Sequence, residues 1–163
     1  MTATPPPPPS AGVAEALGRI PSGLFVVATR GADGPLGFVG SFVQQVAFEP
    51  PTVMVAIAAG REHLAAVRRS GRFAVSILGE DDKALMRPFF KAPASGTPFD
   101  ALATETTPGG LPVLAEALAW LDCRLVGEHN AGDHVVVFGA VEAAARLADG
   151  EPAVHVRRNG LAY

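Results

Sequence analysis

The sequence lacks the marks of several common protein classes. It has one cysteine among 163 residues, Cys123, which excludes a disulfide framework within the chain and a zinc site of several cysteines. No apolar run approaches the roughly 20 residues of a membrane span. The N-terminal MTATPPPPPS has neither the basic nor the apolar region of a signal peptide. These absences predict a cytoplasmic protein without a membrane partner, in which Cys123 is a small buried hydrophobe.

Common nucleotide and hydrolase motifs are also missing. The glycines of GPLGFVG have three-residue spacing but open no helix, so they do not form a Rossmann fingerprint. There is no P-loop and no GxSxG motif. The histidines lie in different segments and lack the i, i+4 pairing of a helical zinc motif, so we expect no metal site: His63, His129, His134 and His155.

The charge balance is close to neutral. Charged residues make up 18% of the chain and hydrophobic residues 48%, with a formal net charge of −3. This composition is typical of one soluble domain with its own core. It produces no overall positive field, so we expect no nucleic-acid partner.

Proline is concentrated at the N-terminus, where residues 5–9 are all proline. Such a run favours an extended, solvated polyproline II conformation. We therefore predict a disordered tail over residues 1–12 and one folded domain over residues 13–163. The folded part should begin with a short amphipathic helix, VAEALGRI.

Strand patterns dominate the rest of the chain. LFVVAT, FVGSFVQQV, TVMVAIA and FAVSIL are β-rich runs, and two long strands over residues 117–129 and 134–147 flank the turn NAGD. REHLAAVRRS, followed by Gly71, and DDKALMRPFF are typical of short helices. Because these elements do not alternate as βαβ units, we predict a mainly antiparallel β-barrel with a few short peripheral helices.

One strand contains an unusual pair of residues. In SFVQQVAFEPP, Gln44 and Gln45 are adjacent, and a regular strand turns neighbouring side chains to opposite faces. One glutamine should therefore face the interior or a ligand. Pro50 and Pro51 remove two backbone donors and should hold the end of the strand away from a regular ladder.

Five segments in this order carry a family resemblance: SFVQQVAFEPP, LMRPFFKAPASG, GLPVLAEALAWLDC, GDHVVVFGAV and VHVRRNG. Together they resemble the flavin reductase-like family of FMN-binding split barrels, over residues 20–163. They are most similar to the module at the C-terminal end of cyanobacterial-type flavodiiron proteins. The resemblance implies a split, Greek-key antiparallel barrel. It also implies a homodimer with FMN near the subunit interface, and FAD is the alternative flavin.

The resemblance also implies where the flavin binds. Arg61 would contact the phosphate, and Phe89 and Lys91 would lie near the flavin's tail. Alternatives remain from the residues themselves, because Ser41 could cap a turn, Phe42 could belong to the core and the glutamines could lie at a dimer interface. The ring would be met by the strand before the prolines, through Gly40, Ser41, Phe42, Gln44, Gln45 and Val46.

His134 is the predicted catalytic residue. In similar proteins the Gly-Asp-His turn brings this histidine beside the flavin, where nicotinamide stacks. A neutral imidazole can hydrogen-bond a carboxamide or stabilise charge on the reduced flavin. Asp133 would either fix the tautomer of His134 or only form the turn. His155 could approach the same site or have a structural role.

The resemblance implies an NAD(P)H-dependent flavin reductase that transfers hydride from NADH or NADPH to FMN. Reduced flavin would then pass to a monooxygenase or another redox partner. The alternative is a non-catalytic FMN-binding module that relays electrons to a partner oxidoreductase. The sequence does not choose between NADH and NADPH, because it contains no dinucleotide motif.

Overall fold

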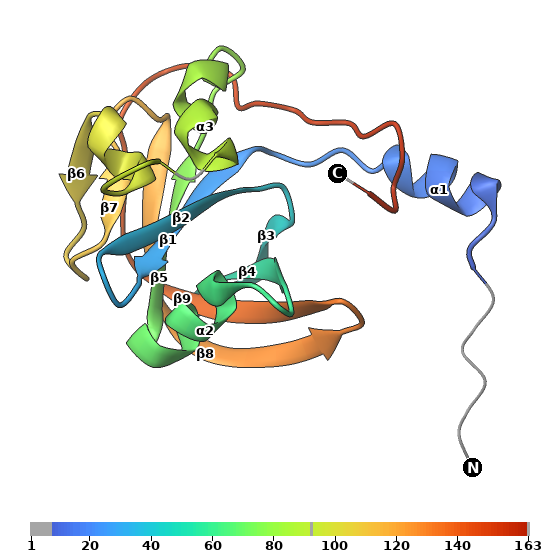
Figure 1. The fold of residues 1–163 in the computed structure, drawn as a ribbon, viewed down its shortest axis with the longest axis horizontal. Helices are drawn as coiled ribbons and strands as arrows, with labels where there is room; N and C mark the ends of the chain where they lie inside the picture. Colours follow the sequence, from blue (N-terminus) through green and yellow to red (C-terminus); the bar gives the residue numbers. More distant parts are fainter. Residues whose placement is uncertain (1–7, 92, 163) are drawn as a thin grey trace.

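One antiparallel sheet forms most of the molecule. The computed structural model describes residues 8–91 and 93–162. Their main sheet has seven strands in the order β2-β1-β5-β8-β9-β4-β3 (Figure 1). These strands are β1 (Phe25–Arg30), β2 (Pro35–Gly40), β3 (Val43–Phe48), β4 (Pro51–Ala58), β5 (Arg72–Ile77), β8 (Ala119–Ala131) and β9 (His134–Arg146). The predicted mainly β class is confirmed. The sequence patterns missed a second, two-stranded sheet, β6 (Thr104–Thr106) with β7 (Pro112–Leu114).

Short helices lie around the sheet. They are α1 (Ala11–Gly18), α2 (Glu62–Ser70), α3 (Lys83–Phe90) and the 3-10 helix η1 (Pro98–Ala101). As predicted, α2 ends at Gly71, which adopts the left-handed conformation with a φ of 67°. Within residues 8–91 and 93–162, no helix has the length and apolar character needed to cross a membrane. Residues 1–7 of the predicted Pro-rich tail lie outside the described residues.

The core lies inside the curve of the main sheet. Strand β4 alternates as a half-buried strand should, and its buried side chains are Val53, Val55 and Ile57. They pack with Phe73 of β5, which is fully buried. A Cβ atom at position 139 would collide with the Phe73 ring, so Gly139 of β9 makes room for this fully buried side chain.

Cys123 lies on β8 and is fully buried. Burial, helped by the charge of Asp122, raises the pKa of its thiol to about 12. The reactive thiolate is therefore scarce near neutral pH. The prediction that Cys123 is a small buried hydrophobe is confirmed.

The sheet is split between β2 and β3. The sequence predicted one continuous strand over residues 38–46, and this was wrong. Residues up to Gly40 pair with β1, whereas those from Val43 pair with β4 at the opposite edge of the sheet. The chain crosses between these edges through Ser41 and Phe42 alone, which places this two-residue link at the opening of the barrel.

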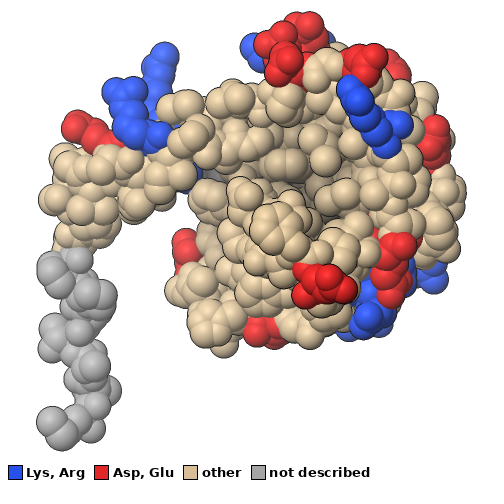
Figure 2. All heavy atoms as spheres, turned by 180° about the vertical axis from the view of Figure 1, so that it is seen from behind, with Lys and Arg blue, Asp and Glu red and all other residues tan. Residues whose placement is uncertain are grey.

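Helix α1 and residues 154–162 form an arm that projects from the barrel (Figures 1 and 2). The backbone N–H of Gly160 donates to the carbonyl oxygen of Ala14 at 2.8 Å, which fixes the two parts of the arm together. Ser22 and His155 exchange two backbone hydrogen bonds where the arm joins the barrel. The arm and its junction carry several exposed apolar side chains: Val13, Leu17, Ile20, Val154, Val156 and Leu161.

Candidate functional site

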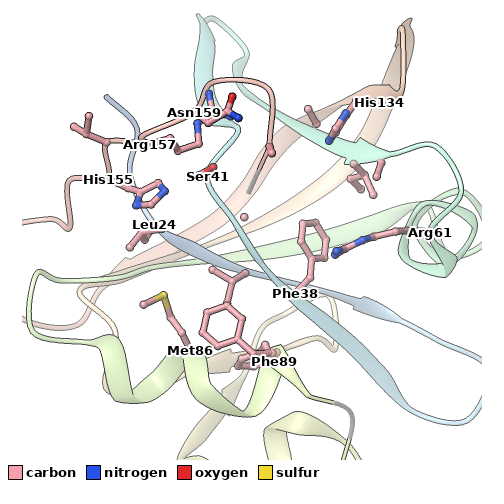
Figure 3. Close-up of a pocket in the computed structure, with 18 of the residues that line it drawn as sticks. Leu24, Phe38, Ser41, Arg61, Met86, Phe89, His134, His155, Arg157 and Asn159 are labelled. Carbon is pink, nitrogen blue, oxygen red and sulfur yellow. The ribbon is translucent and has the colours of Figure 1, made fainter. Parts of the chain in front are cut away.

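A cavity of about 1070 Å³ opens beside the split in the sheet (Figure 3). Its volume is slightly above the roughly 300–1,000 Å³ that small-molecule sites commonly have. Its walls come from the end of β2 and the link, the end of β4, helix α3, the first residue of β9 and residues 155–162. Elements far apart in the sequence thus meet around a space suited to a nucleotide-sized ligand.

Ser41, in the link, presents an unsatisfied polar group. The residue is only 6% exposed and lines the cavity. Its hydroxyl oxygen is buried and has no hydrogen-bond partner among the described residues. Leaving a buried polar group unpaired costs about 1–3 kcal/mol. A bound ligand with a polar edge would supply the missing partner.

An apolar wall lies opposite, built from Phe38 and Phe89. The His63 ring packs edge-on against Phe38 with 5.1 Å between centroids, and its Nε2 lies 3.2 Å from the carbonyl oxygen of Gly37. The Nε2–H therefore donates to β2. Burial lowers the pKa of His63, which keeps the imidazole neutral in this role. Phe89 packs against Phe99 beside Gly37, where a Cβ atom would collide with both rings.

His134 begins β9 directly after the turn at Gly132, which has a φ of 70°. Its Nδ1 lies 2.8 Å from Oδ1 of Asp133. This hydrogen bond, with the nearby imidazole charge, lowers the pKa of the Asp133 carboxyl group. A carboxylate only accepts, so Nδ1 carries the proton in the neutral ring and Nε2 keeps its lone pair. Asp133 therefore both forms the turn and fixes the tautomer of His134.

Phe42, the other residue of the link, contacts groups from two distant segments. Its ring meets His134 edge-on at a centroid distance of 5.8 Å. The guanidinium carbon of Arg157 lies 4.7 Å from its centroid, a distance typical of a cation–π contact. Phe42 thus packs beside the cavity wall and connects His134 with the C-terminal segment.

The cavity is strongly cationic, although the chain as a whole has a net charge of −3. No acidic residue lines it among the described residues. The described arginines that form salt bridges all lie elsewhere: Arg68, Arg72, Arg124 and Arg146. A concave site lined by one sign of charge concentrates ligands of the opposite sign. Its cations are Arg61, Lys83, Arg87, Arg157 and Arg158.

The structure brings some of the predicted site residues to this cavity and leaves others away from it. Phe42 packs beside the wall, as described above. Lys91 is exposed beyond α3 and does not line the cavity in the described structure. The predicted residues that do line it are Gly40, Ser41, Arg61, Phe89 and His134.

Gln44, Gln45 and Val46 are all exposed in the single chain. The expectation that one glutamine faces inward was wrong for this chain. Both glutamines pair in regular register with β4, Gln44 with Met54 and Gln45 with Val53, and the pairing shifts only after Gln45. Because β3 is an edge strand, neither side chain is covered in the single chain. Only Val43, at its start, packs into the core. A role of these three residues in binding FMN stays a prediction.

Apart from Phe89, sequence reasoning missed the cavity residues of α3 and most of those in the C-terminal segment. Lys83 and Arg87 are four residues apart on α3, a spacing that places two cations on one helix face. His155, considered as one of two alternatives, does line the cavity. The pair Arg157 and Arg158 in VHVRRNG was the available signal, but nothing local showed that this segment folds back over the split.

Residues 17–160 match the family model described as the flavin reductase like domain. The chain belongs to this family. It is 36% identical over 156 residues to a putative diflavin flavoprotein A 3 of Synechocystis sp., which covers 94% of this chain and 26% of that protein. It therefore spans about a quarter of that relative, in agreement with the predicted resemblance to one module of a longer protein.

Two further comparisons cover most of both partners. FMN reductase (NADH) RutF of Methylorubrum extorquens is 33% identical over 152 residues, which is 93% of this chain and 74% of that protein. The styrene monooxygenase flavin reductase of Pseudomonas putida superposes with a TM-score of 0.75 at 28% identity, covering 88% of this chain and 91% of that one. The predicted family and fold are thereby confirmed.

The residues of the cavity fit a flavin nucleotide. A flavin has a flat aromatic ring, a polar pyrimidine edge and a phosphate. The apolar walls suit the ring, the buried hydroxyl of Ser41 lacks a partner, and Arg61 has no ion pair among the described residues. The described part of the chain contains no cluster of three or more His, Cys, Asp or Glu residues suited to a metal ion.

Proposed function

We propose that this protein is an NAD(P)H-dependent flavin reductase that binds FMN in the cavity beside the split. The observation that carries the proposal is the convergence of Ser41, Arg61 and His134 on one cationic cavity in a chain of this family. When bound, the flavin supplies the hydride-accepting chemistry, and the protein supplies binding, orientation and electrostatics. The cavity volume would also admit FAD in place of FMN.

In this proposal the two ends of the cavity have different tasks. Arg61 precedes the first turn of α2, where its guanidinium and the nearby backbone N–H groups favour a phosphate. Ser41 and the backbone of Gly40 would meet the polar edge of the ring. The side chains of Phe38 and Phe89 exclude water from its flat face.

His134 would meet the nicotinamide. Because Asp133 holds the proton on Nδ1, Nε2 can accept a hydrogen bond from the carboxamide N–H₂ group of NADH or NADPH. Such a bond would orient the nicotinamide for hydride transfer, and it needs no proton transfer to or from His134.

We also propose a homodimer. The exposed apolar residues of the arm have no cover within the described chain, and the face beside the arm in Figure 2 carries few charged residues. A second copy that covers this surface would remove apolar area from water. Since residues 155–162 belong both to the arm and to the cavity wall, the partner would lie close to the flavin site.

The relatives support two proposals for the acceptor of electrons from the reduced flavin. The styrene monooxygenase flavin reductase carries the name of its monooxygenase partner, which supports transfer of reduced flavin to a second enzyme. The diflavin flavoprotein is a longer chain, which supports the alternative of an electron relay beside another redox centre. We infer a cytoplasmic location from the single buried cysteine.

The experiment that tests the function measures binding and turnover separately. Purified protein is titrated with FMN and followed by quenching of flavin fluorescence. The loss of NADH or NADPH absorbance is then recorded with catalytic protein and excess FMN. Multiple turnovers support the reductase, whereas reduction of only one equivalent of bound flavin supports the relay. Failure to bind either FMN or FAD overturns both.

A further inference from the structure

Arg157 is held in a defined position at the edge of the cavity. Two residues before it, His155 exchanges backbone hydrogen bonds of 2.7 and 2.9 Å with Ser22. Three residues after it, Gly160 donates to the carbonyl of Ala14 at 2.8 Å. Between these anchors the guanidinium rests over the Phe42 ring. The side chain is half-buried, so its position is set by packing as well as by the backbone.

The position of Arg157 is tied to that of His134 through Phe42. The guanidinium carbon is 4.7 Å from the Phe42 centroid, and that centroid is 5.8 Å from the centroid of His134. The guanidinium and the imidazole are therefore at most about 10.5 Å apart. In a nicotinamide dinucleotide, one ribose separates the nicotinamide from the diphosphate. A nicotinamide at His134 would thus bring its diphosphate within reach of Arg157.

The distribution of positive charge in the cavity also favours a second anion besides the flavin phosphate. Arg61 and Arg157 lie on opposite sides of the cavity (Figure 3), so one phosphate cannot be assigned to both. A flavin phosphate at Arg61 leaves the cations of the C-terminal segment without a counter-charge. Arg157 forms no salt bridge with a described acidic residue. A partly buried guanidinium that faces a concave site without an acidic neighbour favours an anionic ligand.

We propose that Arg157 is a binding residue for the diphosphate of the nicotinamide dinucleotide. This inference rests on the proposed function. It assigns a residue to the diphosphate of NADH or NADPH, for which the proposed function names none. The contact with Phe42 holds the guanidinium beside the cavity. One Nη1–H makes a long donation of 3.5 Å to the carbonyl oxygen of Gly160, and the remaining N–H groups can donate to phosphate oxygens. Lysine could supply the charge but neither the planar stacking nor the paired donors. The diphosphate is common to NADH and NADPH, so both should depend on Arg157.

The test compares Arg157→Gln and Arg157→Lys with Arg69→Gln, which removes an exposed cation of α2 away from the cavity. The FMN-loaded proteins are titrated calorimetrically with ADP-ribose, which has the diphosphate but no nicotinamide. Arg157→Gln should weaken ADP-ribose binding by roughly tenfold to a hundredfold and raise KM for NADH and NADPH alike. Arg157→Lys should fall between it and the wild type. The FMN affinity should stay within about threefold of the wild type, and Arg69→Gln should match the wild type.

The possible outcomes distinguish a failure of the Arg157 assignment from a failure of the proposed reductase function. If the wild type binds FMN and oxidises NADH but Arg157→Gln keeps the ADP-ribose affinity and KM of Arg69→Gln, the assignment of Arg157 is wrong. It is equally wrong if FMN affinity falls as much as ADP-ribose affinity, since Arg157 would then anchor the flavin. If ADP-ribose binding depends on Arg157 but the wild type catalyses no turnover, the diphosphate site stands and the reductase proposal fails.

Discussion

Asp133 and His134 form a hydrogen-bonded pair at the head of β9, with Oδ1 of the carboxylate 2.8 Å from Nδ1 of the imidazole. The two side chains differ in exposure, since that of Asp133 is 92% exposed and that of His134 only 19%. The carboxylate thus approaches from solvent while the ring faces the cavity. The pair orients His134 without burying a charge, which is a low-cost way to fix a tautomer.

Asp133→Asn should slow hydride transfer without weakening FMN binding. An asparagine can rotate its N–H₂ group toward Nδ1, which then accepts, and the proton moves to Nε2 in the wrong tautomer. We expect a decrease of about threefold to thirtyfold in the rate of flavin reduction in stopped-flow experiments. Glu128→Gln, which removes a carboxylate that pairs with Arg68 outside the cavity, is the control. An unchanged reduction rate would mean that Asp133 only shapes the turn.

Arg61→Ala should weaken FMN binding roughly tenfold to a hundredfold, because one charge-assisted contact contributes about 1.5–3 kcal/mol. Fluorescence titration of the variant measures this loss directly. Arg68→Ala on the same helix is the matched control, since its guanidinium pairs with Glu128 outside the cavity. If Arg61→Ala binds FMN as tightly as the wild type, Arg61 does not hold the phosphate, and the cations of α3 become the candidates for this role.

His63 should make the stability of the protein depend on pH. Burial lowers its pKa below the ordinary histidine value of 6.5, so the unfolded chain binds the proton more readily than the folded one. Its contribution is fully present above the unfolded pKa and is lost as the pH falls from there through the folded pKa. Melting temperatures from about pH 7.5 down to pH 5 should therefore fall more steeply in the wild type than in His63→Gln. Parallel curves for the two proteins would contradict this.

A charge placed on the arm should dissociate the proposed dimer. Ile20 is 57% exposed in the single chain, where no described residue covers it. Ile20→Glu would require a carboxylate to be desolvated at the interface, which is costly without a partner. We expect a dimer for the wild type and a monomer for the variant in light scattering at micromolar concentration. Glu105→Gln, an exposed change on β6, should leave the dimer intact. A monomeric wild type would remove the dimer proposal.

The sequence predicted the parts of this molecule that depend on local patterns. The apolar, β-rich run TVMVAIA identified β4, and Gly71 marked the end of α2, because both signals come from a few adjacent residues. The break at Ser41 could not be predicted in this way. It arises because the residues on either side pair with opposite edges of one sheet, and that choice depends on the whole topology.

The candidate site shows the same division. His134 follows a glycine turn that a short motif reveals, whereas Arg157 reaches the cavity only because residues 155–162 fold back beside α1. Similarly, one of Gln44 and Gln45 was expected to face inward, but both lie on an edge strand where neither side chain is covered in the single chain. Tertiary placement, rather than residue type, decided each of these differences.

His134→Ala should separate catalysis from flavin binding. The imidazole contacts the Phe42 ring, and the proposal places it at the nicotinamide rather than at the flavin phosphate. FMN affinity should therefore stay within about threefold of the wild type. Losing the hydrogen bond that orients the carboxamide should slow hydride transfer by on the order of tenfold to a thousandfold, or about 1.4–4 kcal/mol in the activation free energy.

His134→Gln provides the matched comparison, because its carboxamide can still accept a hydrogen bond from the nicotinamide. It should recover part of the rate that His134→Ala loses. His129→Ala, on the exposed end of β8, controls for the loss of a histidine outside the cavity. Stopped-flow reduction at saturating NADH and NADPH measures the chemical step apart from binding. If His134→Ala reduces its flavin at the wild-type rate with both nucleotides, His134 is only a turn residue. The bound flavin would then receive hydride without help from this side chain.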